Sequence, residues 1–166
     1  GPQALEVLAS VFSQVPSEDF AQVNEHGHSL VKLPHGAGFQ LWLYPNHAKP
    51  TLVALSSKCT LSTNELWNEN LIRHGIGHVS ASTQEAFIPQ MINLTQNNGI
   101  SFNKGCYTGQ EIVARMQYLG KLKRHMYRLG FDTQSQLNNG DEVCVSGQTS
   151  SVGVVVNCVN INAQQQ

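Results

Sequence analysis

Apolar residues in the first part of the chain switch from helical to extended spacing. Over residues 3–13 they recur every three or four positions, which predicts a helix whose continuation Pro16 limits. Residues 29–33 and 39–44 instead have the composition and alternation of half-buried strands. The Pro-His-Gly sequence at 34–36 lies between them and predicts a hairpin.

A helix, a short strand and a second helix are expected next, over residues 47–57, 59–61 and 63–74. Pro50 falls in the first turn of the first helix, where its missing N–H does little harm. Ser62 and Glu65 have the spacing of a capping box, and Gly75 is the natural stop. Residues 76–102 show no long periodicity and are expected to be irregular.

The strongest helix start lies in residues 103–115, Asn-Lys-Gly-Cys-Tyr-Thr-Gly-Gln-Glu-Ile-Val-Ala-Arg. Thr108 and Glu111 have capping-box spacing, in which each side chain satisfies a backbone N–H of the first turn. Glu111 and Arg115 lie one turn apart with the acid first, which is the favourable order. The expected apolar face of this helix consists of Ile112, Val113, Met116 and Leu119. Gly120 can end the helix in a left-handed conformation.

Beyond residue 120 the apolar pattern changes to a period of two, which is typical of strands. Three strands are expected, over residues 123–131, 142–145 and 152–156. Asn-Asn-Gly at 138–140 and Ser-Gly at 146–147 predict turns. We therefore expect a boundary near residue 121, with an α+β domain over 1–120 and an incomplete antiparallel β-barrel over 121–166.

Composition indicates a globular protein of one domain or two small ones, with 166 residues of which 40% are hydrophobic. No apolar run approaches the roughly 18 residues of a membrane span, and no signal peptide opens the chain, so a cytoplasmic location is expected. Six of the ten basic residues lie between positions 104 and 128, with Glu111 as the single acid there. Such a segment is either a solvated face or a surface for a polyanion such as RNA.

Cys106 is the candidate for chemistry. It lies two residues before the expected N-cap, near the positive end of the helix dipole and beside Lys104, and both features favour a thiolate. Gly105 and Gly109 bracket it, which suggests unusual backbone dihedrals or the close approach of another group. The alternative is a small apolar residue packed in a turn.

The other cysteines and the seven histidines indicate no metal site. Cys59, Cys144 and Cys158 form no C-x-x-C pair, and the last two lie in strand-like runs typical of buried structural cysteines. The histidines form no H-E-x-x-H motif and are expected in loops or solvent.

Residues 104–111 together with Arg115 resemble the K-G-C-[FY]-x-G-Q-E-x-x-x-R signature of the YgfZ family. The resemblance extends upstream through Phe-Ile-Pro-Gln at 87–90, Asn-Leu at 93–94 and Gly-Ile-Ser-Phe at 99–102. Members of this family are folate-binding relatives of the glycine-cleavage T-protein, an aminomethyltransferase. They are associated with tRNA modification and with iron–sulfur cluster assembly or maintenance.

The resemblance implies the ferredoxin-like half of an aminomethyltransferase-type folate-binding body, followed by the start of a C-terminal β-barrel. Full-length members have an additional N-terminal region and a longer barrel, so the resemblance also implies a fragment. It implies tetrahydrofolate or a derivative as cofactor. The implied partners are iron–sulfur-dependent tRNA-modifying enzymes or cluster-assembly proteins, with direct RNA binding as a further option.

By the same resemblance, Cys106 would be the reactive or ligating thiol, and Lys104 would tune its charge. The residues that would shape the motif are Gly105, Tyr107, Gly109, Gln110, Glu111 and Arg115. Trp67 would line the folate pocket, since an indole face suits stacking on a pterin or aminobenzoyl ring. From the residues alone, Trp67 fits a core-facing aromatic equally well.

Arg73 departs from the family pattern, in which many relatives have a pterin-binding glutamate. A guanidinium group offers only hydrogen-bond donors where an acceptor is needed. This departure counts against a T-protein-type aminomethyltransferase, which is one alternative function. The other alternative is a non-catalytic structural module in which Cys106 is buried and inert.

Overall fold

The computed structural model describes residues 1–131 and 136–160. The chain divides into two compact units, Gly1–Thr63 and Asn64–Gln166, and each is described by itself. The predicted boundary near residue 121 separates domains of the implied full-length architecture and stays a prediction. The described ranges contain helices and small antiparallel sheets, so the α+β class is confirmed. They contain no helix that is long and apolar enough to cross a membrane.

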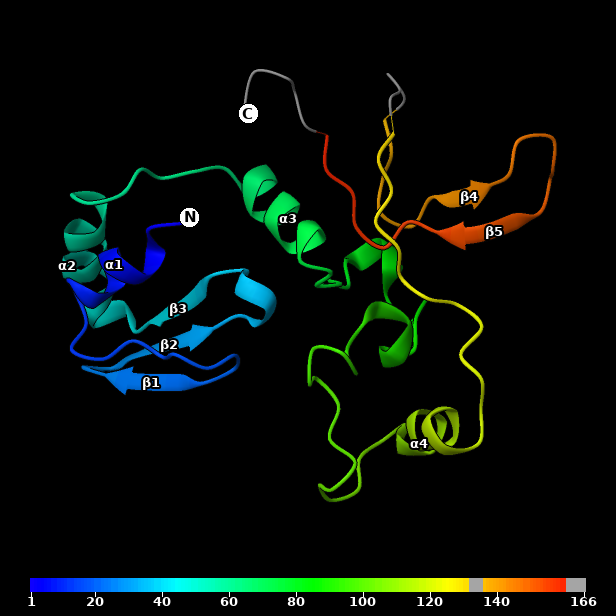
Figure 1. Cartoon of the computed structure of the whole chain (residues 1–166), viewed down its shortest axis with the longest axis horizontal. Coiled ribbons are helices and arrows are strands. Elements are labelled where there is room, and N and C mark those ends of the chain that lie inside the picture. Colours follow the sequence, from blue (N-terminus) through cyan, green and yellow to red (C-terminus); the bar gives the residue numbers. More distant parts are fainter. Residues whose placement is uncertain (132–135, 161–166) are drawn as a thin grey trace. The chain divides into compact units, whose positions relative to one another are not determined.

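The first unit is a three-stranded antiparallel sheet with two helices over one face (Figure 1). Its elements are α1 (Ala4–Ala9), β1 (Gln22–Glu25), β2 (His28–Lys32), β3 (Phe39–Leu43) and α2 (Pro45–Ser56). Strand β2 is central and pairs with both neighbours, placing Leu30 opposite Leu41. Leu30 is 1% exposed and packs with Leu8 and Phe12, so the core lies between the helices and the sheet.

The predicted hairpin over 29–33 and 39–44 is confirmed, with a one-turn 3₁₀ helix, η1 (Pro34–Gly36), as its connection. Strand β1 was not predicted, because its sequence Gln-Val-Asn-Glu lacks the apolar alternation of a strand. The predicted strand at 59–61 is wrong: these residues form turn and coil, and Leu61 is 97% exposed. A strand without a neighbour has no partners for its backbone groups.

Helix α2 begins at Pro45, so Pro50 lies inside the helix rather than in its first turn. Pro45 itself occupies the first helical position, where proline is preorganised for the helix. The sequence analysis therefore began this helix two residues too late.

The second unit is built from α3 (Asn64–Arg73), η2 (Ala81–Thr83), η3 (Pro89–Ile92), α4 (Gln110–Tyr118), β4 (Glu142–Cys144) and β5 (Ser151–Val154). Strands β4 and β5 pair as an antiparallel hairpin, which confirms two of the predicted strands. Asn157 joins the segment after this hairpin to the irregular segment 76–102. Its side chain accepts a hydrogen bond from the His78 amide at 2.8 Å and donates one to the His78 carbonyl at 2.9 Å.

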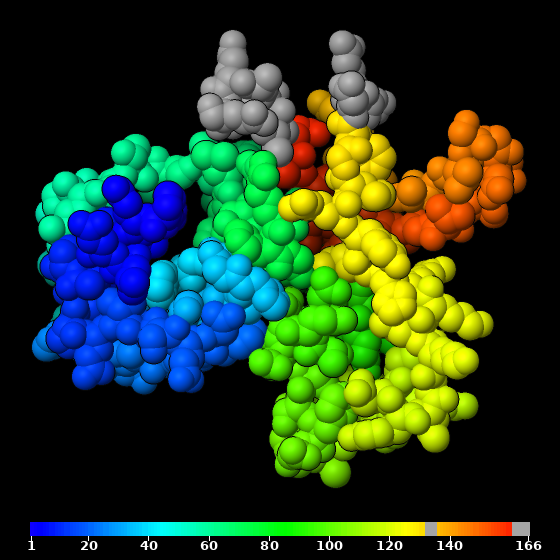
Figure 2. Space-filling model, viewed as in Figure 1, coloured from blue at the N-terminus to red at the C-terminus, as the bar shows by residue number. Residues whose placement is uncertain are grey.

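The predicted strand over 123–131 is wrong. These residues form no backbone hydrogen bond with any described residue, so they belong to no ladder within the described ranges. The segment lies along the surface of the second unit, yellow in Figure 2, and leaves Tyr127, Leu129 and Phe131 exposed. The predicted barrel is represented in the described ranges only by the β4–β5 hairpin.

Candidate functional site

The loop before α4 carries the predicted thiol at its surface. Cys106 is a free cysteine with an exposed side chain, so it is not the packed turn residue of the alternative interpretation. Its sulfur has no hydrogen-bond partner among the described residues. The site therefore leaves this thiol open to a reagent, a substrate or a metal centre.

Gly109 starts helix α4, and the predicted capping box is wrong. Thr108 was the predicted N-cap, but the helix begins two residues later, at Gln110, and no side chain caps it. The N-cap is Gly109, whose φ of 87° and ψ of 1° are left-handed. A residue with a Cβ is strained in this conformation, which explains why the motif has a glycine at this position.

Gln110 closes the loop on itself. Its backbone N–H donates to the Tyr107 carbonyl at 3.2 Å, and its side-chain Oε1 accepts from the Tyr107 N–H at 3.3 Å. This reciprocal pair satisfies polar groups just outside the helix start, as a capping side chain would. The loop that carries Cys106 is thus tied to the first residue of α4.

Lys104 lies over the ring of Tyr107, with its Nζ 4.7 Å from the ring centroid. A cation over an aromatic face is attracted by the ring quadrupole. Lys104 and Tyr107 precede and follow Cys106 in the sequence, and their side chains are in contact. Within the described ranges, however, no hydrogen bond or ion pair joins Lys104 to Cys106.

The remaining motif residues have smaller roles in the geometry. In the ranges that the structure describes, no ion pair joins Glu111 to Arg115, and both side chains are exposed. Gly105 has neither a positive φ nor a close neighbour, so the unusual backbone expected around Cys106 is present only at Gly109.

Two contacts anchor α4 in the second unit. Gln90 is buried and donates from Nε2 to the Val113 carbonyl at 2.8 Å, while Phe102 meets Tyr118 edge-on at 5.7 Å between ring centroids. Gln90 belongs to the Phe-Ile-Pro-Gln sequence already noted at 87–90, but periodicity gave no sign of its anchoring contact. The predicted apolar face is only partly covered, since Val113 is buried while Ile112 is exposed.

The predicted left-handed end at Gly120 is wrong, because this glycine does not have a positive φ. Its amide donates to the Arg115 carbonyl at 2.9 Å. A Cβ at this position would lie 2.9 Å from the Met116 sulfur, so close approach, and not handedness, explains a glycine here.

Trp67 and Arg73 lie on α3. Trp67 is 39% exposed, so it is not a core residue in this structure. Arg73 forms an ion pair with Glu69, one helical turn earlier, and its carbonyl accepts a hydrogen bond from Arg128. No hydrogen bond, ion pair or ring contact among the described residues links Trp67 to the Cys106 loop.

A metal site does not emerge from the described part of the chain, where no group of three or more His, Cys, Asp or Glu side chains could hold an ion.

The thiols differ in their surroundings. Burial, assisted by the charge of Asp141, raises the pKa of Cys158 above its ordinary value. Cys144, predicted to be buried, is exposed.

We expect Cys106 to be the most reactive of the four thiols. It is exposed and unpartnered, whereas Cys158 has a raised pKa and therefore less thiolate at any given pH. Alkylation with iodoacetamide at neutral pH, followed by peptide mapping, should label Cys106 first and Cys158 last. Faster labelling of Cys59, whose thiol donates to the Leu55 carbonyl at 3.1 Å, would contradict the expectation.

Comparison with curated proteins supports the family resemblance, although no family model matches the chain. The tRNA-modifying protein YgfZ of Pectobacterium carotovorum subsp. carotovorum (strain PC1) is 40% identical over 139 residues, 83% of this chain and 42% of that protein. YgfZ of Colwellia psychrerythraea (strain 34H) is 39% identical over 145 residues, 86% of this chain and 44% of that protein.

A third relative, YgfZ of Escherichia fergusonii, is 36% identical over 130 residues, 78% of this chain and 40% of that protein. The chain thus spans about two fifths of the length of these curated relatives. Over most of its own length, the chain is therefore similar to proteins of the YgfZ family.

Proposed function

We propose that this chain is part of a folate-binding protein that supports tRNA modification and the assembly or maintenance of iron–sulfur clusters. The observation that carries the proposal is the similarity of the chain, over most of its length, to proteins named tRNA-modifying protein YgfZ. In this proposal the chain forms the ferredoxin-like half of an aminomethyltransferase-type body and the start of the C-terminal barrel.

Cys106 is the key group in the proposal, as a reactive or ligating thiol. Three features of the loop support this role: the thiol is exposed, Gly109 and Gln110 hold its loop at the start of α4, and Lys104 lies nearby over Tyr107. A group that must meet a partner molecule needs such access on a constrained loop.

Tetrahydrofolate or a derivative is the proposed cofactor, with Trp67 as a stacking residue. Its indole on α3 is 39% exposed, and an indole ring suits stacking on a heterocycle. Arg73 does not supply the acceptor that a pterin edge needs, and its guanidinium is occupied by Glu69. A T-protein-type aminomethyltransferase is therefore the less favoured function.

The proposed partners are iron–sulfur-dependent tRNA-modifying enzymes or cluster-assembly proteins, with RNA itself as a further partner. All six basic residues between 104 and 128 are exposed, and none of them pairs with an acid in the described ranges. Exposed tyrosines, including Tyr118 and Tyr127, lie in the same segment and suit base stacking.

Complementation tests the proposed function. In a bacterial strain that lacks its own YgfZ protein, the gene for the whole protein that contains this chain should restore thiomethylated nucleosides in tRNA, measured by mass spectrometry of digested tRNA. An empty vector and a frameshifted gene are the controls, because neither produces the protein and neither should restore the nucleosides. Unchanged nucleoside levels with the protein present at normal abundance would contradict the function.

A further inference from the structure

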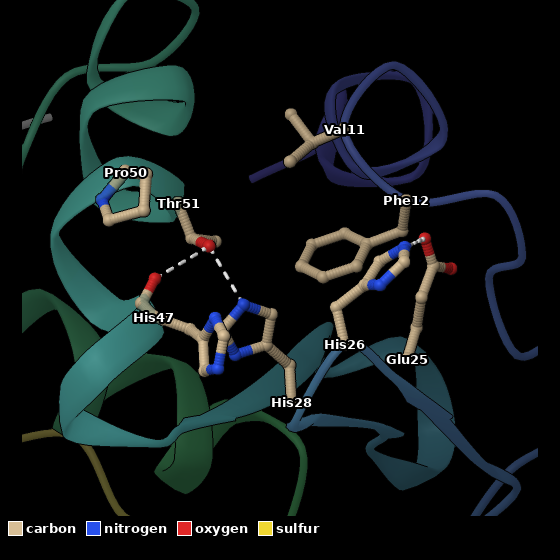
Figure 3. A pocket seen from close by; sticks show the side chains of 8 residues that line it. All are labelled: Val11, Phe12, Glu25, His26, His28, His47, Pro50 and Thr51. Atoms are coloured by element: carbon tan, nitrogen blue, oxygen red, sulfur yellow. Dashed lines mark hydrogen bonds and ion pairs between the residues drawn. The ribbon is translucent and has the colours of Figure 1, made fainter.

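The two faces of the β1–β2–β3 sheet differ in the hollows that they carry. On the helix side, a hollow of about 200 Å³ lies among residues that include Phe12, His28 and Thr51 (Figure 3). On the opposite face, a hollow of about 460 Å³ is lined by residues of all three strands and by the start of α2. Of these two volumes, only the second lies within the roughly 300–1,000 Å³ that is typical of small-molecule sites.

Alternation along β3 places Trp42 on the face away from the helices. Leu41, its neighbour in the strand, packs against the core, whereas Trp42 is 62% exposed. Tyr44 follows two residues later with an extended backbone and is 65% exposed. Both side chains line the larger hollow. This face therefore presents two aromatic rings that the packing of the first unit leaves mostly uncovered.

A hydrogen-bond network fixes the polar groups across the sheet from Trp42. The register pairs Trp42 with Ser29, and Ser29 with Asn24. Nε2 of Gln22 donates to Oδ1 of Asn24 at 2.8 Å and to the Ser29 hydroxyl at 3.2 Å. The Ser29 hydroxyl donates to the same Asn24 oxygen at 2.6 Å. Both amide protons of Gln22 are thus used, and its Oε1 is an oriented acceptor without a partner in the described ranges.

Among the described residues, no charged side chain lines this hollow. Its polar lining consists of Gln22, Ser29 and the hydroxyl of Tyr44, and the other lining side chains are apolar or aromatic. A charged ligand would lose hydration here without meeting an opposite charge. A sugar has hydroxyl groups all around its ring and would turn some of them toward Leu43 and Pro45. The lining therefore favours a neutral, flat ligand whose hydrogen-bonding groups lie along one edge.

We propose that this face binds a free nucleoside, with its base stacked on Trp42 and an N–H of the base donating to Oε1 of Gln22. Nucleobases are flat and neutral at pH 7, and each has a face that stacks on an aromatic side chain. The Tyr44 hydroxyl is available to a ring nitrogen or to the ribose. A free nucleoside fits better than an RNA strand, because phosphate contacts dominate the affinity for RNA and the lining offers no cation. The proposal uses the first unit alone and does not depend on the proposed function.

NMR of the indole N–H groups tests the proposal on the whole chain. The chain has two tryptophans, Trp42 and Trp67, and the spectrum of Trp42→Phe assigns their two signals. Adenosine should shift the Trp42 signal saturably, with an affinity that is the same at low and high salt. Glucose, which is neutral but not aromatic, should not shift it. A shift of Trp67 alone, or an equal effect of glucose, would overturn the proposal.

Single-stranded polyuridylate separates a free nucleoside from an RNA strand. It should not shift the Trp42 signal at lower nucleotide concentrations than adenosine does. A shift at lower concentrations that disappears in high salt would identify a nucleic-acid strand as the occupant and refute the proposal.

Variants locate the site. Trp42→Ala removes the stacking surface but no core contact and should weaken adenosine binding about tenfold or more, followed by calorimetry. Gln22→Leu keeps the side-chain size, removes the acceptor and should weaken binding about fivefold. Phe131→Ala is the matched control, because Phe131 is an exposed aromatic residue of the second unit, and it should bind adenosine like the unchanged chain. Unchanged affinity in either Trp42→Ala or Gln22→Leu would contradict the proposed contacts.

Discussion

Replacing Cys106 by serine should leave the protein folded and abolish its contribution to tRNA modification. Serine is nearly isosteric with cysteine, and the side chain is exposed with no hydrogen-bond partner in the described ranges, so the fold loses no contact. A serine hydroxyl is neither a thiolate nucleophile nor a soft metal ligand at neutral pH. The loss of function would therefore come from the thiol itself.

The measurement is the level of thiomethylated tRNA nucleosides in the complemented strain, beside the thermal melting of the purified variant. Cys144→Ser is the matched control, because Cys144 is also an exposed free cysteine in the second unit. It should melt and modify tRNA like the unchanged protein. If Cys106→Ser also does both, the thiol is structural and the proposed role of Cys106 is wrong.

Replacing Gly109 by alanine should destabilise the loop that carries Cys106. At φ 87° an L-residue has its Cβ too close to the following carbonyl oxygen, which costs about 1–2 kcal/mol. Gly105→Ala is the matched control within the same motif, because Gly105 has an ordinary φ and open space around a Cβ. Denaturant unfolding followed by circular dichroism should show the loss for Gly109→Ala alone.

Glu111→Ala extends this comparison to the helix start. The side chain makes neither a cap nor an ion pair in the described ranges, so its removal should change the free energy of unfolding by less than about 0.5 kcal/mol. A larger loss than that of Gly109→Ala would show that a capping box with Thr108 forms in solution. It would also contradict the left-handed start at Gly109.

Local patterns predicted most of the first unit. The hairpin of β2 and β3 follows from alternation and a turn signal within a few residues, and both are readable without knowledge of the rest of the chain. Strand β1 escaped prediction because its four residues are mostly polar, and pairing with β2 decides its conformation. The same dependence on a partner explains why residues 123–131, with a strand-like pattern, form no strand.

The candidate site divides in the same way. The motif around Cys106 and the position of a helix after it are readable from the sequence, because they depend on residue types at short spacing. Only the structure shows three other features: the helix start at Gly109, the hydrogen bond from the Tyr107 amide to the Gln110 side chain, and the ion pair of Arg73 with Glu69. Polar side chains can form several competing local hydrogen bonds, and the sequence does not decide among them.

By itself, the sequence indicated the resemblance to YgfZ proteins, the motif cysteine and the approximate places of most helices and of the first hairpin. Only the tertiary structure decided which apolar residues are covered and which polar atoms are left without partners. Leu30 and Ile112 are both apolar, but one is buried beneath two helices and the other is exposed. His28 is likewise a polar residue that becomes buried only through contacts with Thr51 and Phe12 from distant positions, because burial is a property of the packed chain.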